Sequence, residues 1–231
     1  MAVPTPLAAF ARRPAFSPVS RRDLAHWRPG LRDGLAHAEV FAAANEASGA
    51  ALALALALDR AGDDTRAFLW VQDKAALRLS GRPYRPGLPP AWQGRLIHVT
   101  ADKAEDALFA LEEGLRCRDL AFVLGEIAGN PRALGLTASR RLSLAAERHG
   151  SALYLVRIDA RRDLSSARMR WQAKAAPSTP PRWNPAAPGH PAWQAELFRA
   201  RSHPPGEWVL ETEAWGSLAL REASAQAQAH G

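Results

Sequence analysis

The chain has 231 residues, a length that suits one α/β domain with extensions better than two ordinary domains. Hydrophobic residues make up 47% and charged residues 23% of it, which is a globular composition. The single cysteine, Cys117, excludes an internal disulfide framework, and without a cysteine cluster the usual structural zinc patterns are excluded too. The longest apolar run, Ala50–Leu58, is about half of the ~20 residues that a membrane span needs, and Met1–Ser20 lacks the apolar centre of a signal peptide. We therefore expect a cytoplasmic protein.

The net charge is +7, and its distribution is more informative than its size. Residues 1–32 contain six arginines against the single acid Asp23, and residues 157–182 contain seven basic residues against two aspartates. Such clusters fit a phosphate-bearing or acidic partner, and they fit a solvated basic surface without a ligand equally well.

Three regions are predicted along the chain. Residues 1–25, with prolines and scattered arginines, read as a flexible N-terminal arm. Residues 26–216 form a single domain, and the small polar residues that dominate 217–231 predict a disordered tail. The domain contains a proline-rich loop at 177–191.

The first elements of the domain are a strand at 36–43 and a helix at 48–61, with Ser48 as the candidate N-cap. The leucines of this helix alternate with alanines, so every face is apolar, which favours a helix buried on all sides. Further apolar runs predict buried strands at 67–72, 95–99, 120–124 and 152–158. Helical periodicity predicts helices at 103–116 and 137–149, and four prolines between 83 and 90 predict a loop.

The alternation of strands and helices predicts an α/β fold with a mainly parallel sheet and helices on both faces. After residue 161 the pattern changes to short extended segments at 167–174, 193–201 and 207–213. We expect these to be antiparallel edge strands around the loop 177–191.

The segment between the first strand and the first helix is where a phosphate-binding loop would lie. The pattern G-x-x-x-x-G-K-[ST] requires Gly, Gly, Lys and Ser or Thr where this chain has Ala44, Gly49, Ala50 and Ala51. Without the lysine there is no point charge for the β- and γ-phosphates, and without the hydroxyl there is no side chain for Mg²⁺. The sequence therefore predicts no ATP hydrolysis at this loop and no bound cofactor.

Other catalytic candidates are weaker. Glu126, after the strand 120–124, could imitate a metal-organising acid, although capping a loop or pairing with Arg132 explains it more simply; Glu46 and Glu39 are possible remnants. His37, His98 and His149 lie on separate elements in no metal-binding spacing, so we expect no metal site. Cys117 lies between two arginines but in no nucleophile motif, and we expect an ordinary buried or half-buried thiol.

Five of the eight tryptophans occur after residue 165, among basic residues. Such a mixture can bind nucleic acid, with tryptophans stacking on bases and basic residues holding phosphates, or it can form a protein interface. Tryptophans can also fill a small core, and this is what we expect of Trp171 and Trp208. The candidate residues for binding a partner or DNA are Arg168, Arg170, Lys174, Arg182, Trp183, Arg199 and Arg201. Of these, Arg182 and Trp183 in the proline-rich loop are the better candidates.

Several segments together resemble the ImuA family, over about residues 30–215. They are EVFAA, NEASGAALALAL, FLWVQ, GRPYRPGL, ALFALEEGLR, LAFVLGEI, LGLTASRRLSLAAERHGSALYLVR, RWQAKAAPS and PAWQAELFRAR. A more distant resemblance is to RecA, whose nucleotide loop E-S-S-G-K-T aligns with Glu46, Ala47, Ser48, Gly49, Ala50 and Ala51. A fainter one is to the SulA cell-division inhibitors, which share a reduced RecA-like core.

The resemblance to ImuA implies a RecA-like fold with a degenerate nucleotide loop and no catalytic residues to transfer. It implies a non-catalytic adaptor in SOS-induced, error-prone translesion synthesis, with ImuB, an inactive Y-family polymerase relative, as the partner. RecA and the error-prone polymerase are further possible partners. The alternatives are a single-stranded DNA-binding protein that uses the basic, tryptophan-bearing region, a residual ATPase, and a SulA-like inhibitor of cell division.

Overall fold

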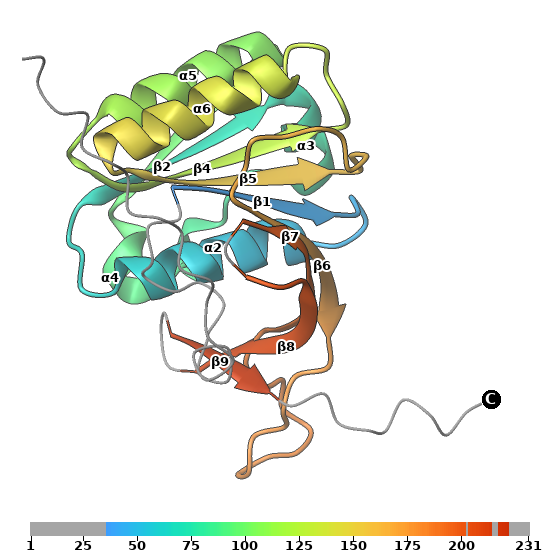
Figure 1. Ribbon diagram of the computed structural model, residues 1–231. Coiled ribbons are helices and arrows are strands. Elements are labelled where there is room, and N and C mark those ends of the chain that lie inside the picture. Colours follow the sequence, from blue (N-terminus) through green and yellow to red (C-terminus); the bar gives the residue numbers. More distant parts are fainter. Residues whose placement is uncertain (1–35, 202, 214–216, 222–231) are drawn as a thin grey trace, which may run out of the picture.

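The computed structural model describes residues 36–201, 203–213 and 217–221, which contain one sheet of nine strands (Figure 1). The strands are β1 (His37–Ala42), β2 (Ala67–Asp73), β3 (Leu96–Ala101), β4 (Leu120–Ala128), β5 (Ala152–Ile158), β6 (Met169–Ala176), β7 (Ala192–Ala200), β8 (Gly206–Thr212) and β9 (Leu218–Arg221). Their order across the sheet is β3-β2-β4-β5-β1-β6-β7-β8-β9. All pairings from β3 to β6 are parallel, and those from β6 to β9 are antiparallel. The predicted α/β class with a mostly parallel sheet is therefore confirmed.

Helices cover both faces of the sheet, as the sequence predicts. They are α2 (Ser48–Ala61), α3 (Lys74–Ser80), the 3₁₀ turn η1 (Arg85–Gly87), the single turn α4 (Pro90–Gln93), α5 (Ala104–Arg116) and α6 (Leu136–His149). Figure 1 shows α5 and α6 together on one face, and α2 and α4 on the other. Two apolar layers result, one containing Leu111 of α5 and Leu142 of α6, the other containing Leu52 and Leu56 of α2.

The antiparallel strands curve away from the plane of the parallel strands and lie beside α2 (Figure 1). Trp193 of β7, Leu210 of β8 and Leu218 of β9 belong to the same buried layer as the leucines of α2. The N–H of Leu218 also donates to Oδ1 of Asp59, at 3.0 Å. Because the sheet bends around α2, the helix is buried on nearly every side, which explains why its sequence has no polar face.

The start of α2 and the end of β4 differ from the sequence prediction. Ser48 was expected to cap α2, but it is the first helical residue and Ala47 occupies the cap without a side-chain hydrogen bond. The Ser48 hydroxyl is buried and has no hydrogen-bond partner within the described residues. The strand β4 continues four residues past 124, because it pairs with β5 up to Ala128, and Glu126 therefore lies within a strand rather than after one.

Sequence periodicity missed four short elements. The helix α3, capped by the Asp73 carboxylate accepting from the N–H of Ala76 at 2.6 Å, is too short to show a period. The proline loop contains η1 and α4, since proline suits the first turn of a helix. The predicted tail at 217–231 is wrong at Leu218–Arg221, which pairs with β8 as β9. The predicted arm at 1–25 and the end of the tail lie outside the described residues.

None of the helices in the described part of the chain combines the length and the apolarity that crossing a bilayer requires.

Candidate functional site

The loop between β1 and α2 lies where a nucleotide-binding loop would lie, at the carboxyl end of β1, and contacts within the protein hold it there. The N–H of Ala44 donates to Oδ1 of Asp159, at 2.9 Å, and Oε2 of Glu46 accepts from the N–H of Ala175 on β6, at 2.8 Å. Glu46 therefore links the loop to β6.

Gly49, the one glycine of the phosphate-loop pattern that remains, has a packing role independent of any phosphate. A Cβ at this position would lie 2.7 Å from Cβ of Ala42 and 3.0 Å from Cγ1 of Val156. The glycine therefore lets the start of α2 approach β1 and β5 closely.

Beside this loop is a cavity of about 560 Å³, within the size range of small-molecule sites. Its walls are the loop, the first turns of α2, the segment from Leu79 to Leu88 and the ends of the central strands. Six alanines line it, at positions 42, 43, 44, 47, 50 and 51. Leu79 and Tyr84 also line it and are 47% and 75% exposed. The cavity is therefore mainly apolar, with an exposed aromatic ring in its lining.

Glu126 is the buried polar group of this cavity, with 1% of its surface exposed. Its Oε1 accepts from Nε1 of Trp70 and its Oε2 from the hydroxyl of Ser80, both at 2.7 Å. Burial raises the pKa of the Glu126 carboxyl, the hydrogen bonds oppose this rise, and the neighbouring Asp73 carboxyl adds to it. The expected pairing with Arg132 is wrong, because Glu126 points to the side of the sheet on which Trp70 lies.

The charges around the cavity do not suit a phosphate group. Its charged lining residues are Glu46, Glu126 and Arg82, so the formal charges sum to −1 with both acids ionised. Ala50 and Ala51 line the cavity where a nucleotide loop would present a lysine and a hydroxyl. A triphosphate would therefore meet a buried acid and one exposed arginine.

The structure separates the candidate partner-binding residues of the C-terminal region into paired and exposed groups. Arg170 is buried, and its Nε donates to Oε2 of Glu39 at 2.7 Å, so its expected role as a contact residue is wrong. Arg168 forms an ion pair with Glu147 of α6, with Nε 2.7 Å from Oε1. Both arginines connect parts of the fold, because β6 lies beside β1 inside the sheet rather than at its edge.

The exposed candidates do not form one patch. Arg199 lies opposite Arg170 near the start of β6, whereas Lys174 lies four residues further along that strand, about 13 Å away. Lys174 lines a shallow polar hollow that contains Arg162 and also two glutamates. Arg201 is exposed near the end of β7 that carries Arg199.

The proline-rich loop presents Arg182 and Trp183 to solvent, and Trp183 is 80% exposed. In contrast, Trp171 and Trp193 are buried, and the Trp171 and Trp208 rings pack 5.9 Å apart, which confirms that they belong to a core. Trp215 lies outside the described residues. A large exposed aromatic beside an arginine is the composition of a contact surface.

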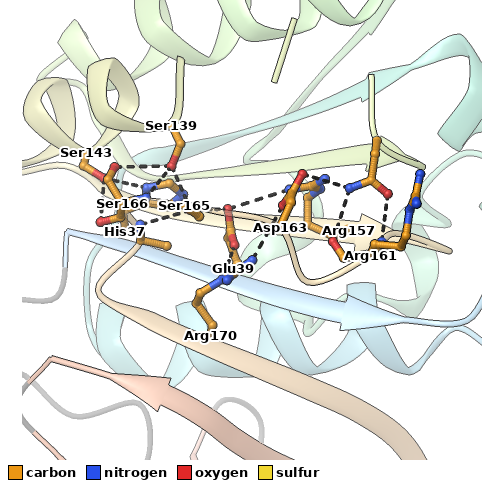
Figure 2. A network of polar contacts seen from close by, with 12 residues as sticks. His37, Glu39, Ser139, Ser143, Arg157, Arg161, Asp163, Ser165, Ser166 and Arg170 are labelled. Atoms are coloured by element: carbon orange, nitrogen blue, oxygen red, sulfur yellow. Dashed lines mark hydrogen bonds and ion pairs between the residues drawn. The ribbon is translucent and has the colours of Figure 1, made fainter. Parts of the chain in front are cut away.

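A buried polar network lies on the α6 side of β1 and was missed as a unit by the sequence prediction (Figure 2). Its centre is Glu39, which is fully buried; its Oε1 accepts from the hydroxyl of Ser165 at 2.7 Å, and Arg157 lies 3.9 Å away on the same side. Together with Arg170, these contacts give Glu39 a structural role. The signal was present in the sequence as charged residues at alternate positions of apolar strands.

The same network contains a serine and a histidine in contact, but it is not a catalytic triad. Nδ1 of His37 lies 2.8 Å from the hydroxyl of Ser143, while its Nε2 is buried and has no hydrogen-bond partner within the described residues. The pKa of His37 is lowered to about 4, chiefly by burial; Glu39 opposes this lowering, and the arginines at 170, 168 and 157 add to it. Both side chains are buried, so no substrate reaches them.

The remaining sequence candidates lie apart from these sites. Nε2 of His98 lies 2.8 Å from Oε1 of Gln72, and Cys117 is exposed after α5 rather than buried, because the chain turns there towards β4. Within the described residues, no three His, Cys, Asp or Glu side chains are grouped as metal ligands. The chain matches no protein-family model and no curated protein.

Proposed function

We propose that this chain is a non-catalytic adaptor with a RecA-like fold, acting in SOS-induced, error-prone translesion synthesis by binding ImuB, with RecA as a second candidate partner. The observation that carries the proposal is the cavity beside β1 and α2. It lies where a nucleotide-binding loop would hold phosphates, but Ala50 and Ala51 occupy the positions of the lysine and the hydroxyl that phosphate and Mg²⁺ binding require. The family resemblance supplies the partners. The parallel sheet with its loop and helix after a central strand supports the RecA-like part of the proposal.

Binding rather than catalysis also agrees with how the polar side chains are used. Glu39, Arg157 and Arg170 are buried in mutual contacts, and Glu46 holds the loop to β6. The large exposed side chains include Tyr84 in the lining of the cavity and Trp183 in the proline-rich loop. Exposed aromatics are typical anchors of protein interfaces.

The experiment is a calorimetric titration of the full-length chain with purified ImuB and, separately, with RecA. We expect saturable binding to ImuB, and binding to neither protein would contradict the adaptor function. A deletion of the C-terminal region is unsuitable as a control, because it would remove β6 and the buried Trp171. The double variant Arg182→Ala, Trp183→Ala tests the proline-rich loop instead and leaves the core intact.

Single-stranded DNA binding is the second candidate, favoured by the exposure of Arg182 and Trp183. If it is real, affinity for an oligothymidylate measured by fluorescence anisotropy falls steeply between about 50 mM and about 200 mM salt. The same double variant then loses binding. Affinity that is independent of salt, or unchanged in the variant, excludes it.

A further inference from the structure

Among the residues that the structure describes, two glutamates on the sheet are fully buried, and one of these two has a cation beside it. Glu39 lies 2.7 Å from Nε of Arg170 and 3.9 Å from an Nη atom of Arg157. Glu126, at 1% exposure, forms no ion pair with any Lys, Arg or His of the described residues, and neither does the buried Asp73 near it. Glutamate and aspartate are almost never fully buried without a partner, so Glu126 requires an explanation.

The position of Glu126 supplies that explanation, because it lines the cavity beside α2, whereas no cavity described for the chain is lined by Glu39. The carboxylate accepts hydrogen bonds from Trp70, Ser80 and Gln72, and a carboxylate has about four acceptor sites. Acceptor capacity therefore remains for a donor that enters from the cavity.

We propose that the cavity binds a basic side chain, arginine or lysine, of a partner protein, and that its cation pairs with Glu126. This inference rests on the proposed adaptor function, for which it names the anchor. The alanine-lined walls suit the aliphatic part of such a side chain, and the exposed ring of Tyr84 can contact a cation on its face. The negative formal charge of the lining, with Glu46 and Glu126 against Arg82, favours a cation over a phosphate group.

The test uses two small probes of the same shape, benzamidine, which is a cation, and benzamide, which is neutral. Each is titrated into the full-length chain, and the indole N–H resonance of Trp70, assigned with Trp70→Phe, reports binding because that group donates to Glu126. We expect benzamidine to bind about ten-fold or more tightly than benzamide, since a charged hydrogen bond in a buried site is the stronger one.

Three variants make the result specific. Glu126→Gln should remove the preference for the cation while preserving the fold, which circular dichroism and a thermal melt verify. Glu105→Gln, on the exposed surface of α5 across the sheet, should leave the preference unchanged. Ala51→Leu, which fills the cavity without changing its charge, should weaken both probes.

Equal affinity for the two probes, or a preference that survives Glu126→Gln, overturns the proposal, and so does displacement of benzamidine by MgATP. A titration of Glu126→Gln with ImuB separates this proposal from the adaptor function. If ImuB binds the wild type and loses affinity for the variant, both stand. If ImuB binds both chains equally, the adaptor function stands and the anchor is wrong. If neither ImuB nor RecA binds the wild type while benzamidine still binds selectively, the cavity is a cation site and the adaptor function is wrong.

Discussion

His37 should make the stability of this protein sensitive to mild acid. Its imidazole is fully buried between β1 and α6, and burial lowers its pKa from 6.5 to about 4. Between these two pH values the unfolded chain binds a proton that the folded chain does not, so stability is present above pH 6.5 and is lost as the pH falls towards 4.

The size of the effect follows from the two pKa values. They differ by about 2.5, and each pKa unit corresponds to about 1.4 kcal/mol, so the full contribution is roughly 3–4 kcal/mol. Between pH 7.5 and pH 5, where the fold can still be measured, about 2 kcal/mol of it is lost. Urea unfolding at a series of pH values, followed by circular dichroism, measures the free energy of unfolding directly.

His37→Asn isolates the contribution of the imidazole. The amide can still contact the Ser143 hydroxyl but does not titrate, so the variant is less stable at pH 7.5 and its curve between pH 7.5 and pH 5 is flatter than that of the wild type by about 2 kcal/mol. Ser143→Ala is the control, because it removes the hydrogen bond at 2.8 Å and keeps the imidazole, and it should retain the steep curve. If wild type and His37→Asn lose stability in parallel, buried His37 is not the source of the acid sensitivity.

Two further substitutions test the packing. Gly49→Ala should destabilise the fold by about 1–3 kcal/mol in urea unfolding, because the new Cβ would lie 2.7 Å from that of Ala42. Gly94→Ala is the control: its Cβ position is open, so stability should change by less than about 0.5 kcal/mol. Equal effects of the two substitutions would refute the close approach of α2 to β1. Trp171→Ala should lower the free energy of unfolding by about 3–5 kcal/mol, and Trp183→Ala, at 80% exposure, by less than about 0.5 kcal/mol. A large loss for Trp183→Ala would show that the proline-rich loop is part of the core.

The sequence predicted the order and type of the long elements because their hydrophobic periods are local. The alternation of apolar strands with helices such as 103–116 placed all five central strands to within a few residues, and the alanine and leucine composition of 48–61 correctly predicted a helix buried on nearly all sides. Short elements such as α3 and β9 were missed, since seven or four residues carry too little periodicity. β9 also depends on its pairing with β8, which no local pattern encodes.

The absence of a lysine and a hydroxyl at the positions of the phosphate-loop pattern was determined by the sequence alone, because it depends on residue identity at fixed spacing. Whether each charged side chain is buried or exposed, and which residue it contacts, was decided only by the tertiary structure. Arg170 and Arg182 are the same residue type within twelve positions of each other, yet one is buried against Glu39, 131 residues away along the chain, and the other is exposed in a loop. Glu39 and Glu126 both occupy apolar strands, and the register of the sheet gives two arginines to the first and a cavity to the second. Strand periodicity defines which face a side chain occupies, but what covers that face depends on contacts between distant segments. These contacts decide whether a buried acid lies beside an arginine or beside a cavity.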